Sequence, residues 1–223
     1  AAAHSEIEPL RKSDGASIAL ISTGQPPAAQ ARARSKAGAM SAALAREPKL
    51  LAFTHVSNVL GTVNDVASIS AEAKAAGATV VIDGAQAAPR MPLDMAAIGA
   101  DFYGATGHKL YGPTGIGVLW GRRELLDGMG PFEGGGSMIG KVTKDNITWA
   151  AVPTRFEAGT PPIAEAVGLG AAVEWMKGVG LENIGAHERA LSSYALPRLA
   201  EVPGMRIFGP GDDEDREGII SFE

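Results

Sequence analysis

The chain has 223 residues, of which 45% are hydrophobic and 20% charged, and its formal net charge is −5. This length corresponds to one large domain or slightly more, which is enough to bury a sizeable core. The acidic balance argues against a nucleic-acid-binding surface, and the absence of cysteine excludes a disulfide, a thiolate metal site or a thiol nucleophile within these residues. No apolar run has the length of a membrane span, and residues 1–6 do not resemble the start of a secretory signal.

The first half of the chain alternates between short apolar runs and helical segments. In chain order we expect a weak Ala-rich helix at 28–46, a strand at 50–54, a helix at 66–76, a strand at 79–83, a short helix at 92–98, and strands at 101–105 and 116–120. Because this order requires crossover connections, the sequence predicts an α/β protein with a mostly parallel sheet and helices on both faces.

After residue 121 the pattern becomes irregular until two prolines open a strong helix at 163–177. A second helix at 181–200 and strands at 205–208 and 219–222, around an acidic loop, complete the prediction. We therefore expect a large domain over 1–165, a connecting helix over 166–180 and the start of a smaller α+β domain over 181–223. Because the last residues form an apolar strand, we expect an internal fragment of a longer protein.

Common sequence signatures do not explain the chain. There is no G-x-x-x-x-G-K-[ST] phosphate loop, and Gly115 and Gly117 supply only half of a dinucleotide-binding fingerprint. The four histidines are widely separated in the sequence and form no short-range ligand pair, so we expect no metal site.

Polar side chains instead follow two neighbouring predicted strands. Asp83 ends one strand and Gln86 follows it, whereas Thr106, His108 and Lys109 follow the next. Taken alone, Asp83 is as well explained as a helix cap and Lys109 as a solvated surface lysine. The carboxyl ends of parallel strands meet at one crevice, however, so we expect these side chains to converge there.

The converging residues match the needs of one cofactor, pyridoxal phosphate. It requires a lysine that forms a Schiff base, an acid beside its ring nitrogen, and donors for its phosphate. The acid keeps the ring nitrogen protonated because opposite charges at short distance favour the ionised pair.

Longer stretches around these residues resemble the SUF-type (group II) cysteine desulfurases. The similar segments are LLAFTHVSNVLGTVN at 50–64, VIDGAQA at 81–87, GHKLYGPTGIG at 107–117 and RFEAGTP at 155–161. The resemblance covers about residues 50–223, whereas residues 1–49 match poorly. It implies a class V aminotransferase with the type I pyridoxal-phosphate fold that forms a homodimer.

The resemblance also implies roles around the cofactor ring. Lys109 would bind the cofactor covalently and, once released, transfer the proton. Asp83 would pair with the ring nitrogen, and Ala85 would pack against one ring face. Gln86 would bond the phenolic oxygen, with Asn58 nearby.

Other roles concern the phosphate and the second ring face. Thr106 and His108 would bind the phosphate, and Thr160 would reach the phosphate of the partner subunit. The family stacks a histidine on the ring; we assign it to His4, although strict register places Ala3 there.

The activity implied for the full-length parent is the conversion of L-cysteine to L-alanine with a protein persulfide for iron–sulfur cluster assembly, passed to a SUF-type acceptor. The alternatives are a selenocysteine lyase, another class V aminotransferase or lyase, and an inactive dimerising scaffold. The family's Gly-Thr-Thr phosphate loop, catalytic cysteine and substrate-binding arginine have no counterpart here, so we expect this fragment alone to be inactive. We expect a cytoplasmic location, or the plastid stroma in a eukaryote, and no binding to nucleic acid or membrane.

Overall fold

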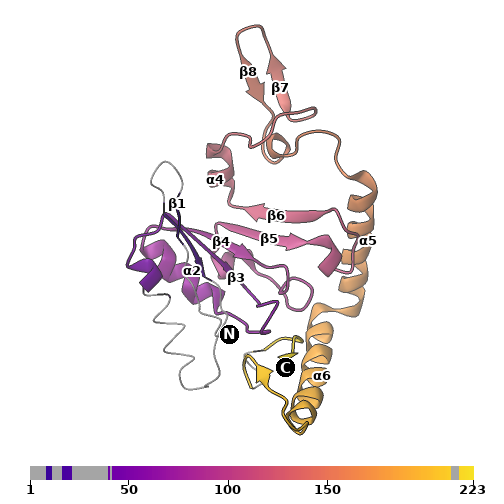
Figure 1. Cartoon of the computed structure of the whole chain (residues 1–223). Helices are drawn as coiled ribbons and strands as arrows, with labels where there is room; N and C mark the ends of the chain where they lie inside the picture. Colours follow the sequence, from indigo (N-terminus) through magenta and orange to yellow (C-terminus); the bar gives the residue numbers. More distant parts are fainter. Residues whose placement is uncertain (1–8, 12–16, 22–39, 41, 212–215) are drawn as a thin grey trace.

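A six-stranded sheet forms the centre of the computed structural model, which describes residues 9–11, 17–21, 40, 42–211 and 216–223 (Figure 1). The sheet order is β1-β2-β3-β4-β5-β6. The strands are β1 Pro9–Arg11, β2 Ser17–Ile21, β3 Leu50–Thr54, β4 Thr79–Asp83, β5 Phe102–Thr106 and β6 Gly117–Gly121. Strands β2 to β5 pair in parallel, so the predicted α/β class with a mostly parallel sheet is confirmed.

Strand β6 runs antiparallel to β5 rather than continuing the parallel order. The connection between them, residues 107–116, contains only a short 3-10 turn at Gly107–Lys109. A parallel crossover needs a dozen or more residues, usually with a helix, and this connection is too short for one. Strands β1 and β2, which also pair antiparallel, were not predicted.

Helices α2 (Val66–Ala75) and α3 (Met95–Ile98) pack beside the sheet. The predicted helix at 66–76 is confirmed, and the one at 92–98 is shorter than predicted. Asp94 shortens it because its carboxylate accepts from the backbone N–H groups of Ala96 and Ala97, which fixes the helix start three residues later than expected. The predicted helix at 28–46 lies mostly outside the described residues.

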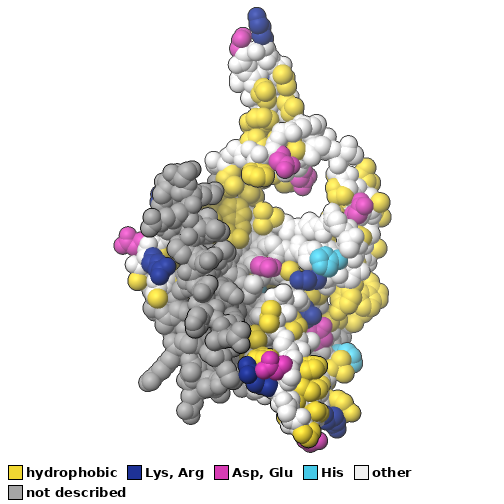
Figure 2. All heavy atoms as spheres, in the orientation of Figure 1, with side chains coloured by type: hydrophobic (Ala, Val, Ile, Leu, Met, Phe, Trp, Pro, Cys, Tyr) yellow, Lys and Arg dark blue, Asp and Glu magenta, His cyan; other side chains and the backbone are white. Residues whose placement is uncertain are grey.

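The segment predicted as irregular contains a helix, α4 (Arg123–Gly128), and a hairpin of β7 (Ile139–Val142) and β8 (Ile147–Trp149). The hairpin projects away from the sheet (Figure 1), and hydrophobic side chains gather along it (Figure 2). These side chains include the exposed Ile139, Val142, Ile147 and Trp149. A short 3-10 turn, Thr154–Phe156, leads on toward the long helices.

Two consecutive helices, α5 (Ile163–Val179) and α6 (Leu181–Ala200), follow as predicted and pack against each other. Gly180 joins them with a φ of 88°, a left-handed conformation that glycine adopts without steric cost. Strands β9 (Ile207–Phe208) and β10 (Ser221–Phe222) then pair antiparallel; both are shorter than predicted. The division of the chain into three domain segments stays a prediction.

Two buried clusters hold these elements together. The larger one fills the space between the sheet and the helices beside it, and includes Leu51, Phe53, Val66, Ala73, Val80, Ile82, Ile98 and Tyr103. The smaller joins α5 and α6 to the segments after β4 and β5, through Ala88, Leu110, Leu169, Met176 and Ile184. No helix in the described part of the chain is long and apolar enough to cross a membrane.

Candidate active site

The carboxyl ends of β3, β4 and β5 lie side by side. In the sheet register Thr54 pairs with Asp83, and Asp83 pairs with Gly104. Residues that follow these strand ends therefore share one edge of the sheet, as predicted for Asp83, Gln86 and the 106–109 segment. A shared edge of this kind is where open α/β sheets bind their ligands.

Asp83 is exposed at the end of β4. Its Oδ1 accepts from the backbone N–H of Ala85 at 2.9 Å, which orders the turn that follows. Residues 85–90 form turns rather than a helix, so Asp83 is a turn residue and not the predicted alternative of a helix cap. Within the described residues no cation forms an ion pair with this carboxylate.

A buried neutral pair lies behind Asp83. His55 Nδ1 and the Tyr103 hydroxyl are 2.9 Å apart, and their rings meet edge to face. Burial lowers the pKa of His55 to about 4, so the imidazole is neutral at physiological pH. Burial and then the negative charge of Asp83 raise the pKa of Tyr103, so the phenol keeps its proton. The polar side chains behind Asp83 are therefore uncharged.

Gly84 makes this arrangement possible. A Cβ atom at this position would lie 1.9 Å from the Tyr103 ring, which is an impossible contact. The absence of a side chain lets Tyr103 pass directly beneath the residue that follows Asp83. Sequence reasoning did not assign a role to Tyr103 or His55. The signal was available as a hydroxyl within the apolar strand β5 and a histidine at the end of β3, which β4 separates from β5.

The segment after β5 carries Thr106, His108 and Lys109. The Thr106 hydroxyl and His108 Nδ1 are 2.9 Å apart, so two groups predicted to bind phosphate lie together at the surface. Lys109 is partly buried at the end of the 3-10 turn, and no described residue forms an ion pair with it. Both Lys109 and Asp83 are accessible rather than enclosed in the packed interior.

Close packing fixes the backbone that presents Lys109. The Gly107 N–H donates to the carbonyl of Ile116 at 2.8 Å, and the Gly112 N–H donates to the carbonyl of Gly107 at 3.0 Å. A Cβ at Gly107 would lie 2.8 Å from the Ile116 side chain, so the loop closes this tightly only because that position is glycine.

The remaining predicted residues are more dispersed. Ala85 and Gln86 are half-buried in the turn after β4, and the Oε1 atom of Gln86 accepts from Arg90 at 2.7 Å. Asn58 is exposed in the turn after β3, and Thr160 is exposed before α5. His4 lies outside the described residues. The predicted roles of these residues stay predictions.

Comparison with known proteins places this chain in a family. The model of the aminotransferase class-V family matches residues 2–223, so the similarity extends beyond the stretch from residue 50 found by inspection. A probable cysteine desulfurase of Streptomyces coelicolor is 54% identical over 179 residues, which make up 80% of this chain and 43% of that protein. The chain thus spans less than half the length of this curated relative.

Solved structures agree with the family match. The apo structure of a cysteine desulfurase from Thermococcus onnurineus has a TM-score of 0.78 and 37% identity, over 82% of this chain and 46% of that one. A C-DES variant with glycine covalently linked to its PLP cofactor has a TM-score of 0.72 and 26% identity, over 92% of this chain and 60% of that one. This chain belongs to the class-V aminotransferase family, whose enzymes use pyridoxal phosphate, and it has their type I fold.

Proposed function

We propose that this chain forms the cofactor-binding part of a pyridoxal-phosphate-dependent cysteine desulfurase. One observation carries the proposal: an accessible carboxylate, Asp83, and an accessible amine, Lys109, follow adjacent parallel strands and have no ionic partner among the described residues. The cysteine desulfurase names of the relatives reported above support cysteine as the substrate.

The donor set fits pyridoxal phosphate. Asp83 has no cation beside it within the described chain, and a protonated ring nitrogen would supply one. The adjacent hydroxyl and imidazole of Thr106 and His108 are suitable partners for phosphate oxygens. Lys109 provides the amine that holds the cofactor covalently.

The chemistry divides between the cofactor and the chain. When bound, pyridoxal phosphate supplies an electron sink for the bonds at the substrate's Cα. Asp83 would hold the proton at the ring nitrogen, and Lys109 Nζ would hold the cofactor and, once released, move the proton at the substrate carbon. Gln86 would bond the phenolic oxygen, with Asn58 nearby, and Ala85 would pack against one ring face.

The proposed reaction requires a cysteine thiolate that accepts the sulfur. The Cβ–S bond of L-cysteine breaks, the sulfur forms an S–S bond with a cysteine thiolate, and the carbon skeleton takes up a proton and leaves as L-alanine. The 223 residues contain no cysteine, so the accepting thiol belongs to residues other than these. We attribute the complete activity to the whole protein.

We further propose the homodimer and the SUF-type subgroup that the sequence resemblance implies. Large apolar side chains are exposed on β6, on the β7–β8 hairpin and on α5, among them Leu119, Val142 and Val167, as expected for surfaces that another chain covers. In the dimer, Thr160 would reach the partner's phosphate and His4 would stack on the ring. Transfer of sulfur to a SUF-type acceptor for iron–sulfur assembly and a cytoplasmic location stay predictions.

Substitution of the lysine tests the proposal. In the whole protein, reduction with borohydride followed by mass spectrometry should place the pyridoxyl group on Lys109. Lys109→Ala should not form this adduct. Its rate of alanine release from cysteine should fall by about 100-fold or more, because the loss of a general acid–base group alone has an effect of that size. Lys177→Ala, which removes an exposed lysine paired with Glu174 on α5, is the matched control and should retain both.

The inactive scaffold and the selenocysteine lyase give different results in the same assay. A Lys109→Ala variant that keeps a covalently bound cofactor and turns over cysteine would contradict the assignment. A wild-type protein that forms no adduct would support the inactive scaffold. An adduct with turnover of selenocysteine but not of cysteine would identify a selenocysteine lyase.

A further inference from the structure

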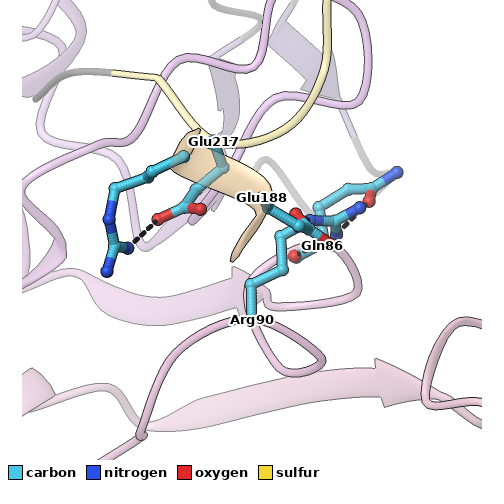
Figure 3. A network of polar contacts seen from close by, with 5 residues as sticks. Gln86, Arg90, Glu188 and Glu217 are labelled. Carbon is cyan, nitrogen blue, oxygen red and sulfur yellow. Dashed lines mark hydrogen bonds and ion pairs between the residues drawn. The ribbon is translucent and has the colours of Figure 1, made fainter. Parts of the chain in front are cut away.

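Arg90 joins Gln86 to helix α6. Its Nη1 donates to Oε1 of Gln86 at 2.7 Å and to the backbone oxygen of the same residue at 2.6 Å. Its Nε donates to Oε2 of Glu188 at 2.6 Å. In Figure 3 these three side chains meet from the turn after β4 and from α6, two segments that are 98 residues apart in sequence. The contact therefore connects a predicted cofactor residue to a distant helix.

The guanidinium dictates how the Gln86 amide is turned. Arginine carries only donors, so the amide must direct its oxygen, and not its nitrogen, toward Arg90. The same Nη1 also binds the backbone oxygen of Gln86, which restricts the side chain further. The NH2 group is consequently presented away from Arg90, and no described residue accepts a hydrogen bond from it. It remains available to a ligand as a donor.

Helix α6 holds Arg90 in this position. The side chains of Arg90 and Glu188 are only 16% and 21% exposed, so their ion pair is better shielded from water than a surface pair. A Cβ at Gly185 would lie 2.6 Å from the backbone oxygen of Arg90, and a Cβ at Gly218 would lie 2.7 Å from Oε2 of Glu188. The two glycines allow the helix and the C-terminal segment to close tightly around the pair.

A second ion pair lies beside the first. Arg189 Nη1 and Glu217 Oε1 are 3.5 Å apart, and Glu217 is drawn with Glu188 and Arg90 in Figure 3. The neighbourhood thus contains two carboxylates and two guanidinium groups. Removal of Arg90 alone would leave two carboxylates beside one guanidinium, so a variant that removes Arg90 together with Glu188 is needed to keep the charges balanced.

We propose that Arg90, held by Glu188, is a positioning residue that makes Gln86 present its NH2 group to the phenolic oxygen of pyridoxal phosphate. This inference depends on the proposed function. Because the NH2 group donates, it stabilises the deprotonated, negatively charged form of that oxygen. Without Arg90 the amide rotates freely, and this stabilisation weakens.

The test is the visible absorbance of the lysine-bound cofactor, titrated with pH in the whole protein. The charge-balanced variant R90M/E188M should move the midpoint of that titration to higher pH by about half a unit to one unit, the equivalent of one lost hydrogen bond. Arg123→Met removes an arginine whose Nε binds Asp127 at 2.7 Å on the surface of α4, and it should leave the midpoint unchanged.

A double-mutant cycle separates positioning from a general structural effect. If Arg90 acts through the amide, R90M/E188M should shift the midpoint in the wild-type background but not in a Gln86→Ala background, where no amide remains to orient. An equal shift in both backgrounds, or none in either, would overturn the inference. Wild-type protein that shows no lysine-bound absorbance would instead refute the proposed function itself.

Discussion

The carboxylate of Asp83 has uncharged neighbours and no ion-pair partner among the described residues. His55 and Tyr103 lie behind Asp83 as a hydrogen-bonded neutral pair, and the tyrosine is close enough for the Asp83 charge to raise its pKa. A cationic support would neutralise the carboxylate and compete with a ring nitrogen for it. The neutral pair leaves the attraction of Asp83 for a positively charged ligand undiminished.

The buried imidazole makes the protein sensitive to acid. The folded-state pKa of His55, about 4, is below its ordinary value of 6.5. As pH falls from 6.5 to 4 the unfolded chain gains a proton that the folded protein does not accept, so His55 causes a loss of stability that reaches about 3 kcal/mol. We expect His55→Gln, which does not titrate, to lose less stability over this range in denaturant unfolding at successive pH values.

The comparison between pH 7 and 8 is the internal control for this prediction. The Gln variant loses the hydrogen bond between His55 Nδ1 and the Tyr103 hydroxyl, so it should be less stable than wild type between pH 7 and 8. In this range the free energies of unfolding of the two proteins should change with pH in parallel. If the two unfolding free energies also changed in parallel between pH 6.5 and 4, the His55 imidazole would take up its proton equally in the folded and the unfolded protein, and the prediction would be wrong.

Sequence reasoning identified the residues at the strand ends but missed those that support them. Asp83 and Lys109 follow runs whose β-branched and apolar composition marks them as strands, so their location at one edge follows from topology. His55 contacts Tyr103 over 48 residues, and Arg90 contacts Glu188 over 98. No local periodicity relates such distant positions, and only the packed fold brings them together.

At the level of elements, local signals determined where helices begin. Helix α2 was predicted within one residue because Gly77 stops its pattern, whereas the cap that Asp65 forms at its start was not predicted. The direction of β6 was not predicted, although the connection of 107–116 was too short for a crossover and gave the information needed. The β7–β8 hairpin was missed because its strands are short and Gly140, Lys141 and Thr148 interrupt their apolar residues.

The cap of α2 provides a test at this scale. Asp65 accepts from the Ser68 backbone N–H at 3.1 Å and from its hydroxyl at 2.7 Å. These bonds, with the Ser68 hydroxyl contributing most, lower the pKa of Asp65. We expect Asp65→Ala to reduce the free energy of unfolding by about 1 kcal/mol, measured by urea denaturation. Asp65→Asn retains an accepting oxygen at the cap and should lose clearly less; equal losses would mean that the cap contributes little.

Across the whole molecule, the C-terminal segment is attached mainly through backbone groups. The guanidinium of Arg216 is fully buried and donates to the carbonyls of Phe208, Pro210 and Ile219 at 2.6 to 2.9 Å. Its backbone forms a bridge with Thr62, and a Cβ at Gly61 would lie 2.6 Å from the Ile219 carbonyl. In Figure 1 this segment lies beside α6, which carries Glu188. The Arg216 guanidinium therefore ties the C-terminal segment together, and the backbone of Arg216 and Glu217 joins that segment to the turn after β3.

We expect Arg216→Met to release this segment. The substitution leaves the buried carbonyl of Pro210 and the partly buried carbonyls of Phe208 and Ile219 without this donor, so the free energy of unfolding should fall by about 3 kcal/mol or more. Hydrogen exchange should accelerate in 57–62 and 205–223, while β3 and β4 stay protected, because their hydrogen bonds do not depend on Arg216. Arg206→Met, which removes an exposed arginine paired with Glu223, is the matched control and should change stability by about 0.5 kcal/mol or less. Unchanged exchange in 57–62 of the Arg216 variant would show that the backbone contacts of Arg216 and Glu217 with this turn do not depend on the buried guanidinium.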